Sequence, residues 1–138
     1  MKKIALFAIV AMGLFSSCNT KSSENQKSET TDTLTSIKFE SKTYAFGQVV
    51  HGQVVEHTFI FTNTGSIDLQ IEEVDAACGC TTPEWTKEPV KPGEKGKIRV
   101  KFDTQHQNLG NKTKQVAVYS NTKPSRNLLQ FTAQIVEE

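Results

Sequence analysis

The residues with the most distinctive chemistry in this sequence are cysteines. Two of them, Cys78 and Cys80, are separated by a single glycine. In an extended chain, side chains two positions apart point the same way, and their Cα atoms lie about 6.5–7 Å apart. That separation is at the limit of what a disulfide spans, so a bond between the two sulfurs requires the chain to bend, which Gly79 allows.

The Cys78–Cys80 pair is open to four interpretations. It could be a structural turn or bulge with two small buried side chains, either bridged or free. It could be a redox-active dithiol, which needs a lowered thiol pKa. It could bind copper(I) or zinc, with help from the scattered histidines His51, His57 and His106. Finally, it could be a surface motif that a protein partner recognises.

The third cysteine, Cys18, lies at the end of a different pattern. The chain opens with Met1-Lys2-Lys3, continues with an apolar run over residues 4–15, and reaches Cys18 through two serines. The run is shorter than the roughly 20 residues of a membrane-spanning helix, and the pattern is typical of a secretory signal. The small residues before Cys18 resemble the bacterial lipobox, although Phe15 stands where leucine is usual. The resemblance implies cleavage after residue 17 and lipid attachment to Cys18.

Beyond the predicted lipid, the sequence divides into a polar segment and a domain. Half of residues 19–36 are serine or threonine, and only Leu34 is apolar. Such a segment cannot bury enough apolar surface to offset its loss of entropy, so residues 18–36 are predicted to form a flexible tether. Residues 37–138 carry 12 basic and 12 acidic side chains. This balance gives no basic surplus for binding nucleic acid.

Residues 37–138 alternate apolar and polar positions, as half-buried strands do. Val55, His57, Phe59 and Phe61, for example, share one face of a predicted strand, which makes His57 a candidate core histidine. Polar turn signals such as Asn63-Thr64-Gly65 separate the segments. About seven strands are expected, over residues 37–40, 44–49, 54–63, 68–74, 97–103, 113–120 and 128–136. This number and spacing favour an all-β, immunoglobulin-like sandwich.

Several motifs resemble those of the domain of unknown function 1573. They are Tyr44-Ala45-Phe46-Gly47-Gln48-Val49, the segment from Phe59 to Gly65, Cys78-Gly79-Cys80-Thr81-Thr82-Pro83, and Pro92-Gly93 with the strand that follows. The resemblance covers about residues 37–136. It implies an immunoglobulin-like fold and often a lipoprotein of envelope bacteria, commonly of the Bacteroidetes group. It implies no activity.

No catalytic signature accompanies these motifs. The sequence has no Ser-His-Asp pattern, no glycine-rich phosphate loop and no His-Glu-x-x-His motif, so no enzyme activity and no cofactor are expected. Trp85 is either a cap on the core or an exposed binding anchor. The sequence therefore predicts a non-enzymatic binding or scaffolding module. Its partners would be a bacterial membrane, at the outer membrane or the periplasmic face, through the lipid on Cys18, and an envelope protein. The alternative is a thiol-dependent redox or soft-metal accessory protein that uses Cys78 and Cys80.

Overall fold

The computed structural model describes residues 34–138, which contain eight strands and no helix. The predicted signal peptide, Cys18 and most of the predicted tether lie outside the described residues. The strands are β1 (Ile37–Phe39), β2 (Thr43–Val50), β3 (Val54–Asn63), β4 (Ile71–Ala76), β5 (Thr81–Trp85), β6 (Lys95–Asp103), β7 (Gly110–Ser120) and β8 (Arg126–Val136).

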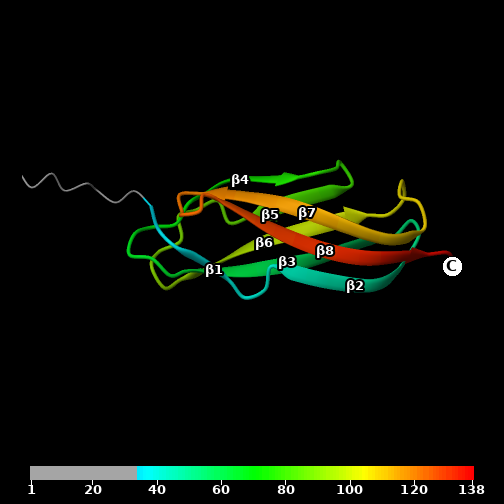
Figure 1. The fold of residues 1–138 in the computed structure, drawn as a ribbon, viewed down its shortest axis with the longest axis horizontal. Helices are drawn as coiled ribbons and strands as arrows, with labels where there is room; N and C mark the ends of the chain where they lie inside the picture. The colour runs from blue at the N-terminus through cyan, green and yellow to red at the C-terminus, as the bar shows by residue number, and fades with distance from the viewer. Residues whose placement is uncertain (1–33) are drawn as a thin grey trace, which may run out of the picture. The chain divides into compact units, whose positions relative to one another are not determined.

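The strands form two four-stranded sheets with the orders β1-β3-β6-β5 and β2-β8-β7-β4. All neighbours are antiparallel except β2 and β8, which run parallel. The first two strands thus belong to different sheets, and the chain crosses from one sheet to the other between Phe39 and Thr43 (Figure 1). The predicted two-sheet, all-β architecture is confirmed.

The core lies between the sheets and is built from the alternating apolar positions of both. In β3, Phe59 and Phe61 are buried while Glu56 is exposed, as the period-two pattern predicts. Gly96 on β6 lies opposite Phe61, and a Cβ atom at this position would lie only 2.2 Å from the phenylalanine ring. The fully buried large apolar side chains are Phe59, Phe61, Leu69, Ile98, Val100, Phe102, Val116, Val118, Leu129, Phe131 and Ile135.

One strand, β5, was not among the predicted seven. It contains Pro83, which cannot donate a backbone hydrogen bond and therefore argues against a strand in a sequence reading. The structure tolerates this proline because β5 is an edge strand that pairs only with β6. Glu84 on β5 forms ion pairs with Arg99 and Lys101 on β6. The hydrogen bond from Arg99 holds the pKa of Glu84 below its ordinary value.

Residues just before residue 37, where the sequence predicted the start of the domain, also contact the sandwich. Thr35 is buried, forms a bridge with Thr122, and donates its backbone N–H to the carbonyl of Asn121 at 2.8 Å. Its hydroxyl donates to the side-chain oxygen of Asn63 at 2.9 Å. Thr35 thus shows that a polar side chain can be buried where it finds hydrogen-bond partners.

The two ends of the sandwich carry different loops. The chain enters beside the loops of residues 64–70 and 121–125, a region called here the near end. The opposite, far end carries the β2–β3 turn (51–53), the β4–β5 loop (77–80), the β6–β7 loop (104–109) and the C-terminal residues (Figure 1). Cys78 and Cys80 therefore lie at the far end.

Candidate functional site

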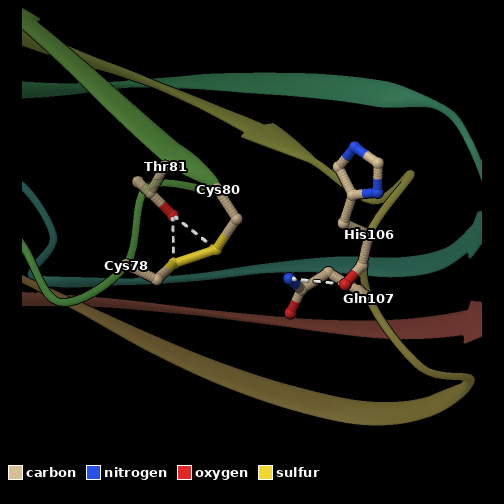
Figure 2. The surroundings of a disulfide bond; sticks show 5 residues. All are labelled: Cys78, Cys80, Thr81, His106 and Gln107. Atoms are coloured by element: carbon tan, nitrogen blue, oxygen red, sulfur yellow. Dashed lines mark hydrogen bonds between the residues drawn. A yellow bond between two sulfur atoms is a disulfide. The ribbon is translucent and has the colours of Figure 1, made fainter.

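The β4–β5 loop joins Cys78 to Cys80 by a disulfide (Figure 2). The two Cα atoms are 5.2 Å apart, closer than in an extended chain and within the usual range for a disulfide. The chain thus bends as the spacing requires. Gly79 does not adopt a left-handed conformation, however, and a Cβ atom on it would contact nothing within 4 Å. Apart from its two cysteine neighbours, Gly79 therefore has open space on the side where a Cβ atom would stand.

Thr81, the first residue of β5, places its hydroxyl beside both sulfurs. Its Oγ1 atom is 3.6 Å from Cys78 Sγ and 3.8 Å from Cys80 Sγ. Because sulfurs in a disulfide carry no hydrogen, the threonine hydroxyl is the donor in these contacts. Thr81 is itself buried, and its position is fixed by pairing with Phe102 on β6. The sequence motif contained Thr81, but nothing in its type indicated that it faces the sulfurs.

A hollow of about 340 Å³ adjoins the bridge. It is called here the disulfide hollow, and its lining residues are Cys78, Gly79, Cys80, Asp103, His106 and Gln107. Figure 2 shows the side chains of His106 and Gln107 on the loop that faces the bridge. The two loops are linked by the backbone hydrogen bond from Asp103 N to Cys80 O, at 2.9 Å. Of the three histidines, His106 is the one that lines this hollow.

The other two histidines lie elsewhere. His51 lines a second hollow at the far end, of about 430 Å³, together with Val50, Gln107, Asn108, Leu109, Glu137 and Glu138. His57 belongs to an aromatic cluster between β2 and β3. Within residues 34–138, no group of three or more His, Cys, Asp or Glu side chains is arranged to hold a metal ion.

His57 is only half-buried, whereas the sequence suggested a core histidine. Its ring stacks on Tyr44 with centroids 3.5 Å apart and meets the edges of Phe46 and Phe59. Burial lowers the pKa of His57, so the folded state favours the neutral ring. The resulting stability is present above the unfolded-state pKa of about 6.5, and it is lost as the pH falls through the lower folded-state pKa.

Trp85, at the end of β5, packs partly buried against the core. The Nζ atom of Lys87 lies 3.0 Å from the centre of the indole ring and covers it. The indole Nε1 atom is buried, and it has no hydrogen-bond partner among the described residues. Trp85 therefore caps the core at the β5 edge of the sheet. Lys87, the positively charged residue nearest in sequence to the cysteines, contacts the indole ring and not the sulfurs.

Comparison with known protein families identifies the family of this chain. The model of the protein family of unknown function DUF1573 matches residues 37–135. The chain belongs to the DUF1573 family. The resemblance seen in the Tyr44, Cys78-Gly79-Cys80 and Pro92-Gly93 motifs is thereby confirmed. No curated protein matches the sequence.

Solved structures that resemble this DUF1573 domain share its fold at low identity. A protein of unknown function from Porphyromonas gingivalis W83 has a TM-score of 0.66 and 16% identity, over 73% of this chain and 47% of that one. The ASH/PapD-like domain 7 of human CEP192 has a TM-score of 0.63 and 12% identity, over 77% and 89%. The VesB protease of Vibrio cholerae has a TM-score of 0.56 and 14% identity, over 72% and 31%.

These likenesses show the fold and no more. The predicted immunoglobulin-like sandwich is confirmed by the PapD-like neighbour. The DUF1573 chain spans about half the length of the Porphyromonas protein, which is itself of unknown function. Among residues 34–138, no helix is long and apolar enough to cross a membrane.

Proposed function

We propose that the protein is a non-enzymatic, lipid-anchored binding or scaffolding module of the bacterial envelope, and that it binds an envelope protein through its far end. One observation carries the proposal. Of the large apolar side chains in the described domain, Val54 and Leu109 are the most exposed, at 60% and 46%, and both lie at the far end. Apolar side chains that a domain exposes at its loop end offer contact area to a protein partner.

The surroundings of these two side chains support the same role. Leu109 lines the hollow of about 430 Å³, and the disulfide hollow adjoins it through the shared residue Gln107. Val54 starts β3 directly after the turn of residues 51–53. Loops on a rigid sandwich are common carriers of binding residues, because they vary without disturbing the core. A nearly neutral domain favours a protein partner over nucleic acid.

The proposed anchor suits this arrangement. The chain enters the described domain at the near end, where Thr35 bridges to Thr122. A tether from lipid-modified Cys18 would attach there, on the side opposite Val54 and Leu109. Because the predicted tether is flexible, the domain would be free to turn, and Val54 and Leu109 at the far end could reach a partner.

Replacing Cys18 with alanine is expected to release the protein from the membrane fraction into the soluble envelope fraction. The physical reason is that the acyl chains of the attached lipid hold a protein on a membrane far more firmly than a nearly neutral surface does. Fractionation followed by intact mass spectrometry measures both the location and the added lipid. A membrane-bound protein whose chain starts elsewhere, without lipid on Cys18, would contradict the anchor.

A photo-crosslinking side chain placed at Leu109 is expected to give one discrete adduct in intact cells. The matched control is Leu128, which is 39% exposed but lies on the outer face of β8, away from the far-end loops. Gel electrophoresis and mass spectrometry identify the adducts. Equal adducts at both positions, or an adduct at Leu128 alone, would show that the far end is not the binding surface.

A further inference from the structure

We propose that the Cys78–Cys80 disulfide is a thiol exchange site, which accepts two electrons from a dithiol of a partner protein. The proposal goes beyond the binding role. It describes a single stoichiometric exchange, and it does not depend on the lipid anchor.

The bridge is accessible where a partner would bind. Cys78 and Cys80 are each partly exposed, and both line the disulfide hollow at the far end. Gly79 between them adds no side chain, and the space where its Cβ would stand is open. The disulfide hollow therefore gives a thiolate a route to the bridge. Figure 2 shows the bridge together with His106 and Gln107, two of the residues that line this hollow.

The bridge adds little to the stability of the fold. It closes a loop of only three residues, and the entropy that a disulfide removes from the unfolded chain grows with loop length. The loop has other supports: Thr81 N donates to Cys78 O at 3.2 Å, and Asp103 N donates to Cys80 O at 2.9 Å. These hydrogen bonds do not involve the sulfurs. They would keep the two thiols close together after reduction, so the pair could form its bridge again.

Thr81 supplies the donor that an exchange reaction needs. Its buried hydroxyl already lies within reach of both sulfurs. When the bridge opens, a sulfur leaves as a thiolate, and a hydrogen bond to a charged atom is stronger than one to a neutral atom. Thr81 is therefore a positioning residue that favours the reduced, thiolate form of the pair.

The packing of the two cysteines points to an order for the reaction. Both are partly exposed, but only Cys80 packs against the hydrophobic core, so we assign Cys78 as the sulfur that the partner attacks. A partner thiolate attacks Cys78 Sγ, the bond between Cys78 and Cys80 breaks, and its electron pair goes to Cys80 Sγ. The second partner thiolate then attacks the partner sulfur of the mixed disulfide and releases Cys78. The partner loses two electrons and two protons and becomes a disulfide. Of the two protein sulfurs, one takes up a proton and becomes a thiol, the other stays a thiolate beside the Thr81 hydroxyl, and the second proton goes to solvent.

Glutathione buffers of increasing ratio of reduced to oxidised form test the equilibrium on the purified full-length protein. The reduced fraction is read by alkylation and mass spectrometry. We expect half of the protein molecules to have a reduced Cys78–Cys80 pair in a buffer with millimolar glutathione. In the Thr81→Val variant the ratio needed should rise about tenfold, because a hydrogen bond to the thiolate is lost. Thr82→Val, at the exposed neighbouring position, is the matched control and should leave the ratio unchanged.

Trapping with a disulfide-containing peptide tests the order of attack. Reduced Cys80→Ser should hold the peptide in a stable mixed disulfide at Cys78, and Cys78→Ser should react at least several-fold more slowly. The proposal is overturned if the bridge stays oxidised in every glutathione buffer, if Thr81→Val and Thr82→Val behave alike, or if reduction abolishes cooperative unfolding. Retention of zinc or copper(I) by the reduced protein after dialysis would replace exchange with metal binding. None of these outcomes bears on the crosslinking at Leu109.

Discussion

Replacing Phe131 with alanine is expected to lower the free energy of unfolding by about 3–5 kcal/mol. Phe131 is 1% exposed and projects from β8 into the space between the sheets. Its ring centroid lies 5.3 Å from that of Phe102 on β6 and 5.5 Å from that of Phe46 on β2. The substitution therefore removes one aromatic contact across the sheets and another within its own sheet, and it leaves a cavity that the surrounding strands cannot close.

Chemical denaturation of the Phe131→Ala variant measures this effect. Thr132→Ala, one residue further along β8, is the matched control, since Thr132 is half-buried and projects to the other face of the sheet. That change should alter the free energy of unfolding by no more than about 0.5 kcal/mol. Similar losses for the two variants would mean that the faces of β8 are not divided into a buried and a solvent side.

Replacing Asn63 with aspartate is expected to cost at least about 3 kcal/mol, although the two side chains have nearly the same shape. The Asn63 side chain is fully buried, and its oxygen accepts hydrogen bonds from Thr35 and Gly65. Its amide nitrogen donates to Ile67 O at 2.7 Å and to Val90 O at 2.8 Å. A carboxylate cannot donate, so it would face two carbonyl oxygens without a proton between them.

The stability of the Asn63→Asp variant should also depend on pH. Burial and the two carbonyls would raise the pKa of the introduced carboxyl group, so the penalty should shrink as the pH falls and the group takes up a proton. Asn111→Asp, at an exposed position on β7, is the control and should change stability by about 0.5 kcal/mol or less. A loss at position 63 that stays constant between neutral and acidic pH would argue against a buried, unpaired carboxylate.

The sequence predicted the regular part of this fold well. The alternation of Val55, Phe59 and Phe61 defined β3 with the bounds that the structure shows. It did so because one face of each strand packs on the core and the other meets solvent, so the pattern carries the strand and its orientation together. β5 was not predicted, because Pro83 and the short Cys-Gly-Cys segment are typical of a connection between strands. Only the position of β5 at a sheet edge makes the proline acceptable.

The details of the candidate site were less accessible, since they depend on contacts between distant parts of the chain. The requirement that the chain bend between Cys78 and Cys80 could be read from their spacing. The position of His106 in the lining of the disulfide hollow could not be predicted, because His106 lies on the loop between β6 and β7. Asn63 was interpreted as a turn residue, which its type favours. Its role as a buried hub arises only once the segments around Thr35 and Val90 have folded against it.

The crossing of the N-terminal segment from one sheet to the other has a mechanical consequence. If the domain is held at its near end and pulled by a partner at its far end, the load enters through β1 and β2. β2 runs parallel to β8, and the evenly spaced, slanted hydrogen bonds of a parallel pair are loaded together by a pull along the strands. Bonds loaded together resist a pull more than bonds opened one at a time. The arrangement would let a tethered domain bear tension without the loss of its first strands.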